Sequence, residues 1–390
     1  MGFGGRTPKQ RTQRGKVELY ESETSLPFLW VEVNQVFSRG DIGYWNTRWV
    51  ELEAQLRKCP YPLKKLGEFI PETVERDGTE VPGITYGQVG RREYPPAGTT
   101  IQQVNGSVRL LLPGTRRKEE REGVLYLQVR NLRRTGIDHY ETPLEKRFIE
   151  AGSYNDLLRS RVAVGDLLIV NSGIGSLGRC AVLTDQFPLQ PINISQDITR
   201  IILQKIAPEW VAIYLQTEWG ANQIVRYASG VSGQIKIDFG ELRSILIAVP
   251  RAPVQQVFQQ AYRQMVGYHL KSLEAKRDNR PAEAERYQQI ALGMLESLIW
   301  QAERAIRDKS FQPLLLIPAD LPESLVKLLE DEYARIGEIA EQVDIRPQHA
   351  EFKARPLGIP LERDAQITTE VERLMRWVRG FKEFRDAATR

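Results

Sequence analysis

The strongest hint of chemistry is the glycine-rich run Gly173-Ile174-Gly175-Ser176-Leu177-Gly178, which fits the GxGxxG pattern of dinucleotide-binding turns. Such a turn must open a helix, because the amide dipoles of that helix have to face the pyrophosphate. The preceding DLLIVNS predicts the required strand, but the following RCAVLTDQFPLQP predicts a second strand and a turn. We therefore expect a tight strand-to-strand connection and no cofactor. A nicotinamide-dependent enzyme is the alternative, which failure to bind a dinucleotide would exclude.

No other catalytic constellation is visible. His139, His269 and His349 lie in unrelated segments, and no HExxH, GxSxG or P-loop spacing occurs. The sequence also lacks the Asn-Pro-Pro-aromatic loop of adenine methyltransferases and the Pro-Asp with acidic-x-Lys motif of magnesium-dependent restriction nucleases. Cys59 and Cys180 have neither the spacing nor the His partners of a zinc site, so we expect both to be reduced and structural. The prediction is a protein without an active centre or metal.

Charge is distributed unevenly along the chain. The net charge of the 390 residues is only +4, which is too small to indicate nucleic-acid binding by itself. Between Gly87 and Arg161, however, 14 Lys or Arg stand against nine acids. This stretch could supply phosphate contacts, and an ordinary solvated surface is the alternative.

The pattern of charged, apolar and turn-forming residues changes along the chain. Residues 1–16 are basic and lack apolar periodicity, which predicts a mobile tail that either touches DNA phosphates or serves as a solubilising end. A short helix is expected from about Asn46 to Lys58. From Leu63 to Val249 short apolar runs rich in branched residues alternate with turn signals, which predicts a β-rich domain. Two helices, at 208–219 and near 221–228, interrupt it.

Beyond Pro253 the pattern becomes helical, with two apolar stripes at mixed three and four spacing. Pro281 lies between the stripes and predicts a turn or kink. A continuous helix from Val254 to about Arg280 would span about 40 Å. Further helices are expected at 323–342 and 367–387.

The predicted fold class is α+β, with one β-rich domain followed by long dimerisation-type helices and a small helical C-terminal region. The expected domains are a basic tail with a helical lead-in (1–60), the β-rich domain (61–250), a helical spacer or dimerisation region (251–309) and a helical appendage (310–390). No run of 18 apolar residues is present, and we expect a cytoplasmic protein.

Five segments together resemble the target recognition domain of type I restriction-modification specificity subunits, in the family's order and approximate spacing. They are YLQVRNLRRTGID (126–138), VAVGDLLIVNSGIGSLGRCAVL (162–183), NISQDITRIIL (193–203), APEWVAIYLQTEWGANQI (207–224) and SGVSGQIKIDFGELRSILIAVP (229–250). The resemblance implies sequence-specific binding of double-stranded DNA, with the chemistry supplied by a DNA adenine methyltransferase subunit and a restriction or translocase subunit.

Two departures from this family stand out. Full-length specificity subunits carry two recognition domains, whereas this sequence shows one set of motifs, so the resemblance implies a half-subunit that pairs with a second copy or with another recognition chain. The helical tail after Phe311 is not part of the family pattern. A recognition module of another defence or mobile-element complex, docked through that tail, is therefore the alternative function.

Two groups of residues are the candidates for DNA contact. Basic, irregular stretches could read base edges through Gln88, Arg91, Arg92, Arg116, Arg117, Arg130, Asn131, Arg133 and Arg134. Residues with hydrogen-bonding reach near the glycine turns are Ser172, Arg179, Gln196, Gln234 and Lys236. Structural hydrogen bonding is the competing role for the second group.

Overall fold

The computed structural model describes residues 18–21, 27–30, 47–90, 92–114, 119–173, 175–229 and 235–308. The chain divides into two compact units, Met1–Lys58 and Cys59–Arg390. In the first unit, β1 (Glu18–Glu21) pairs antiparallel with β2 (Pro27–Trp30), and α2 (Thr47–Leu56) forms the expected lead-in helix. The expected basic tail and the expected helices after residue 310 lie outside the described residues.

The second unit contains two main sheets. The first has the strand order β12-β9-β8-β7, and a further strand, β15, pairs in parallel with β9. Asn105 and Gly106 both adopt positive φ and join β7 to β8 in the tight hairpin that an Asn-Gly pair favours. The strands are β7 (Thr100–Val104), β8 (Ser107–Leu111), β9 (Glu120–Leu127), β12 (Phe148–Glu150) and β15 (Ile192–Ile194).

The second sheet is antiparallel throughout, in the order β14-β13-β16-β6, and three of its four strands, β13, β14 and β16, are buried along their whole length. The glycine-rich run joins β13 to β14, with φ values of 99° at Gly173, 74° at Gly175 and 80° at Gly178. The expected strand-to-strand connection is confirmed, and among the described residues between the two strands none is helical. The strands are β6 (Ile84–Tyr86), β13 (Leu167–Val170), β14 (Cys180–Val182) and β16 (Ile198–Ile201).

Shorter elements complete the β-rich region. Three two-stranded pairs are β3 (Leu63–Lys65) with β17 (Leu246–Ala248), β4 (Thr73–Arg76) with β5 (Thr79–Pro82), and β10 (Leu132–Arg133) with β11 (Gly136–Ile137). Single turns of 3-10 helix are η2 (Leu66–Phe69), η3 (Val129–Asn131), η4 (Leu144–Lys146) and η5 (Leu158–Ser160).

Three short helices follow β16: α3 (Pro208–Tyr214), α4 (Glu218–Tyr227) and α5 (Phe239–Ser244). Helix α3 is buried because its aromatic residues connect it to β17 on one side and to the long helices on the other. The indole Nε1 of Trp210 donates to the carbonyl oxygen of Ala248 at 2.9 Å, and its ring meets Phe258 edge-on at 4.8 Å. The hydroxyl of Tyr214 donates to the carbonyl oxygen of Leu246 at 2.8 Å.

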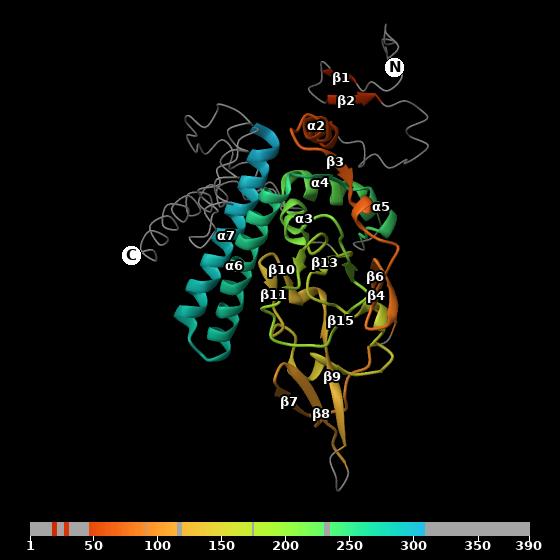
Figure 1. The fold of residues 1–390 in the computed structure, drawn as a ribbon, viewed down its shortest axis with the longest axis vertical. Coiled ribbons are helices and arrows are strands. Elements are labelled where there is room, and N and C mark those ends of the chain that lie inside the picture. The colour runs from red at the N-terminus through yellow and green to blue at the C-terminus, as the bar shows by residue number, and fades with distance from the viewer. Residues whose placement is uncertain are drawn as a thin grey trace, which may run out of the picture. The chain divides into compact units, whose positions relative to one another are not determined.

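The long helices α6 (Ala252–Arg277) and α7 (Pro281–Asp308) form an antiparallel hairpin along one side of the β-rich region (Figure 1). The predicted turn at Pro281 is confirmed, because α7 begins there and Asn279 just before it has φ of 56°. Helix α6 is continuous over 26 residues, and α7 runs back beside it. The architecture is therefore α+β, a β-rich region followed by long helices. Within the described parts of the chain, no helix is long and apolar enough to cross a membrane.

Candidate nucleic-acid interface

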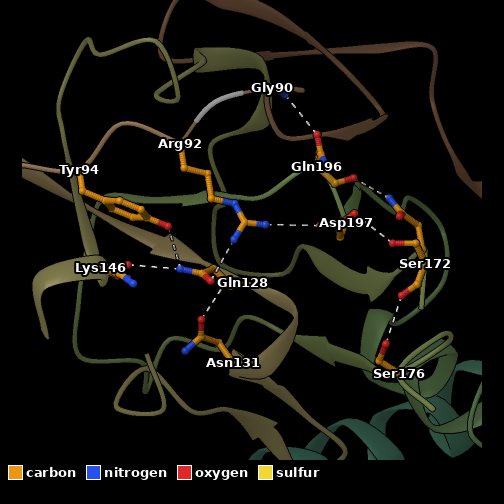
Figure 2. A network of polar contacts seen from close by, with 11 residues as sticks. Gly90, Arg92, Tyr94, Gln128, Asn131, Lys146, Ser172, Ser176, Gln196 and Asp197 are labelled. Carbon is orange, nitrogen blue, oxygen red and sulfur yellow. Dashed lines mark hydrogen bonds and ion pairs between the residues drawn. The ribbon is translucent and has the colours of Figure 1, made fainter. Parts of the chain in front are cut away.

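Sheet topology brings several strand ends to one edge of the β-rich region. Strands β9 and β15 are parallel and therefore end at the same edge, and β16 begins directly after the turn at 195–197. Strands β6 and β13 both run antiparallel to β16, so their ends lie beside its start, as the pairings Tyr86 with Thr199 and Val170 with Ile198 show. The loops that follow these strands consequently meet, although they are far apart in sequence (Figure 2).

Asp197 contacts side chains from two of these loops. Its carboxylate lies 3.6 Å from a terminal nitrogen of Arg92 and accepts a hydrogen bond from the Ser172 hydroxyl at 3.0 Å. The side chain of Arg92 remains 39% exposed. An arginine has five N–H donors, so the guanidinium group is oriented by the protein while part of it stays available to a ligand.

Gln128, directly after β9, holds the guanidinium group of Arg92 by a hydrogen bond. Its amide oxygen accepts from Arg92 at 3.3 Å, and its amide nitrogen donates to the Tyr94 hydroxyl at 3.2 Å and to the Lys146 carbonyl at 3.3 Å. Gln128 is buried, and its backbone N–H donates to the Oδ1 atom of Asn131 at 2.8 Å. The buried side of the polar network around Arg92 is therefore held in place by several hydrogen bonds (Figure 2).

Gln196 joins a further loop to this edge. Its side-chain oxygen accepts from the backbone N–H of Gly90 at 3.3 Å, which holds the loop after β6 against the turn between β15 and β16. The buried Asn171 donates to the Gln196 carbonyl and to the Thr199 hydroxyl, each at 3.0 Å. Gly87 is needed for this approach, because a Cβ atom there would lie 1.7 Å from the carbonyl oxygen of Ile194.

Lys236 brings a cation to the same edge. Its backbone forms bridges to Ser172 and Ser229, and its ammonium group lies 5.4 Å from the centre of the Tyr86 ring. The side chain is exposed. An exposed ammonium group beside Ser172 suits a phosphate contact.

Five predicted candidates therefore lie along this edge, namely Gln88, Arg92, Ser172, Gln196 and Lys236. We call them, together with Asp197, the strand-end cluster. Arg130 is exposed on η3, directly after β9.

Three other predicted arginines surround the β10–β11 hairpin and make internal contacts. Arg133 forms an ion pair with Glu141 at 2.8 Å, and Arg134 forms one with Glu296 of α7 at 3.0 Å. Arg179 donates to the Leu132 carbonyl at 3.3 Å, and its pKa is lowered by burial and then by the neighbouring Arg133. Arg134 also donates to Gln216 at 3.2 Å and so connects the hairpin to the helices.

Asn131 has an internal role rather than the base-reading role considered for it. It is only 1% exposed, its Oδ1 atom accepts from the Gln128 N–H and, at 2.9 Å, from the Thr142 hydroxyl, and its Nδ2 atom donates to the Asp138 carbonyl at 2.7 Å. All of these partners belong to the protein, so we no longer include Asn131 among the proposed DNA contacts. Four remaining candidates lie outside the described residues: Arg91, Arg116, Arg117 and Gln234.

Asp197 and Gln128 were missed by the sequence reasoning. Both belong to segments that carry the family resemblance, but an acid is not expected among candidate DNA contacts, and Gln128 follows an apolar run whose pattern predicts burial alone. Their importance comes from pairing across the edge, which no local pattern reveals. Burial raises the pKa of the nearby Tyr126 to about 12 although the positive charge of Arg92 acts in the opposite direction, so this phenol stays neutral.

Within the described ranges, no group of three His, Cys, Asp or Glu residues is placed to hold a metal ion. The chemistry available at the strand-end cluster is hydrogen bonding and charge attraction. These interactions suit the binding of a polar or charged ligand.

No family model matches the chain, and no curated protein matches it. The backbone is similar to the S subunit of a Type-I restriction-modification system from M. genitalium, with a TM-score of 0.33 and 9% identity over 57% of this chain and 43% of that one. It is also similar to the type IIG restriction endonuclease BpuSI, with a TM-score of 0.37 and 10% identity over 70% of this chain and 36% of that one. A third similar structure is the HsdS subunit from Thermoanaerobacter tengcongensis, with a TM-score of 0.30 and 16% identity over 68% and 53% of the two chains.

The chain therefore spans about half or less of the length of these solved structures.

Proposed function

We propose that this chain recognises a specific sequence in double-stranded DNA through the strand-end cluster. The observation that carries the proposal is the convergence of Arg92, Ser172 and Gln196 from three separate loops onto one partly exposed edge, with Asp197 fixing two of them. Donors and acceptors held on rigid strand ends are what base-edge recognition requires, because only a preoriented group discriminates between bases.

The side chains of the cluster suit different parts of a duplex. Arg92 can donate two hydrogen bonds to the O6 and N7 atoms of guanine, and the Gln196 or Gln88 amide can pair with adenine. Lys236 and the exposed Arg130 are suited to phosphates, which position a protein without selecting a sequence.

We further propose that the chain carries no active centre of its own and directs a DNA adenine methyltransferase subunit, and with it a restriction or translocase subunit, to the recognised site. The support is the resemblance of the five motif segments to type I specificity subunits. One set of motifs in the sequence supports pairing with a second copy or with another recognition chain.

The proposal is tested by selecting bound duplexes from a random DNA pool at near-physiological salt, with and without the candidate methyltransferase. The wild-type chain should enrich a defined site, and Arg92→Ala should lose one position of it. Arg109→Ala is the matched control, because Arg109 is 55% exposed and pairs with Glu120 at 2.6 Å on β8 and β9, away from the cluster. Sequence-blind binding with the partner present would refute the proposal.

A further inference from the structure

Two residues with exposed side chains, Val89 and Tyr154, are joined by a hydrogen bond beside the strand-end cluster. Val89 is 55% exposed and Tyr154 is 48% exposed, and the Tyr154 hydroxyl donates to the Val89 carbonyl at 3.0 Å. Val89 lies directly before Gly90, whose N–H is held by Gln196. We call Val89 and Tyr154 the apolar step.

The loop that carries Tyr154 is fixed from inside the protein. Asp156 accepts two hydrogen bonds from Arg161, at 3.0 and 2.6 Å, and a third from the Gly152 N–H at 3.0 Å. Asn193 of β15 donates to Asp156 at 2.9 Å and accepts from the Ser160 hydroxyl at 2.8 Å. These residues lock residues 152–161 onto the sheet.

A further bond connects this loop to the loop of Val89. The fully buried Asn155 accepts from the backbone N–H of Glu93 at 2.7 Å. With the bond from Tyr154 to Val89, this fixes both members of the apolar step against each other. Their exposure is therefore a property of a rigid surface, which limits the conformational entropy lost when a ligand binds.

The surroundings of the step indicate its ligand. Arg92 follows Val89 by three residues and is 39% exposed, and the exposed Arg159 lies in η5, on the same loop as Tyr154. A polyanion with an apolar group matches this arrangement. In the major groove of duplex DNA the apolar group that varies with sequence is the C5-methyl of thymine.

We propose that Val89 and Tyr154 contact the methyl group of one thymine, next to the position read by Arg92. The inference rests on the proposed function and adds a specificity-determining pair to it. Contact with a methyl group selects A·T in one orientation, because cytosine, adenine and guanine lack that group.

The experiment uses the full chain and the duplex site enriched above. Each thymine is replaced in turn by deoxyuridine, which removes only the methyl group, and the Kd is measured. One replacement should weaken wild-type binding by about fourfold, the amount expected for one buried methyl group. Val89→Thr keeps the shape of the side chain but replaces one methyl group with a hydroxyl, so Val89→Thr and Tyr154→Ala should abolish the difference between thymine and deoxyuridine at that position.

Val104→Thr on β7 is the matched control, because Val104 is also exposed, at 46%, and it should leave the difference intact. If a defined site is enriched but no thymine in it is sensitive, or if the sensitivity survives in both variants, the apolar step is overturned while the proposed function stands. If no defined site is enriched, the proposed function itself fails.

Discussion

The guanidinium group of Arg92 lies 3.6 Å from the carboxylate of Asp197, and the same carboxylate accepts a hydrogen bond from Ser172. An acid in this position lowers the net positive charge of a surface proposed to bind DNA. Its presence there is understandable if the orientation of Arg92 matters more than its charge, because a bidentate contact to guanine requires a fixed guanidinium plane.

Asp197→Asn should therefore separate specificity from affinity. Removing the negative charge should strengthen binding to unrelated DNA, whereas the loss of orientation at Arg92 should reduce discrimination between site and non-site by about 5- to 160-fold, or about 1–3 kcal/mol. Competition binding with specific and random duplexes measures both quantities. Glu120→Gln, at the exposed Arg109 pair, should change neither by a comparable amount. Unchanged discrimination in Asp197→Asn would remove Asp197 from the recognition surface.

The side chain of Lys236 should contact a phosphate, because it is exposed at the strand-end cluster and its ammonium group is oriented over Tyr86. Lys236→Ala should then weaken specific and non-specific binding alike, and it should reduce the slope of log K against log salt concentration by about one. A titration series between low and physiological salt gives the slope. An altered base preference with an unchanged slope would instead place Lys236 at a base edge.

The glycine-rich run shows what the sequence could reveal about this fold. The strand before Gly173 and the strand after Gly178 were predictable from local apolar runs, and the β13–β14 hairpin follows from them. The start of α7 at Pro281 was predictable for the same reason, because proline has a local backbone effect. Features that depend on a few neighbouring residues were therefore recovered.

The candidate site was less predictable from the sequence, because the pairings that form it are not local. Arg92 and Asp197 are more than 100 residues apart in sequence and meet only because β6 and β16 are neighbours. Charge alone could not distinguish Arg92 from Arg134, which uses its guanidinium group to hold α7. Asn131 was indistinguishable from a surface amide until its three buried hydrogen bonds were known.

A buried ionic group should be essential for stability. Asp166, with its side chain 1% exposed, accepts two hydrogen bonds from Arg76, one of them at 2.7 Å, and lies 3.9 Å from the fully buried Arg200. Burial lowers the pKa of Arg200 to about 10, so it stays charged at neutral pH. Asp166→Ala would leave that charge uncompensated and should lower the free energy of unfolding by about 3–5 kcal/mol.

Urea unfolding of the full chain at pH 7 measures this loss. Glu120→Ala removes an exposed partner of Arg109 and should cost at most about 1 kcal/mol. A loss of similar size in both variants would show that Asp166 contributes no more than a surface pair.

His139 should make the protein sensitive to acid. The side chain is 2% exposed, and burial, followed by the positive charge of Arg147, lowers its pKa from 6.5 to about 4. Burial also lowers the pKa of His269. In the unfolded chain His139 regains its ordinary pKa, so between pH 6.5 and 4 the unfolded state binds a proton that the folded state does not.

The contribution of His139 to stability is therefore fully present above pH 6.5 and is lost progressively as the pH falls toward 4, by up to roughly 3 kcal/mol. Urea unfolding at several pH values between 7.5 and 4.5 measures the decline. His139→Gln cannot take up this proton, so its stability should fall less steeply over the same range, whatever its stability at pH 7.5. Equal slopes in the two proteins would mean that His139 is protonated in the folded state as readily as in the unfolded one, and that its burial carries no electrostatic cost.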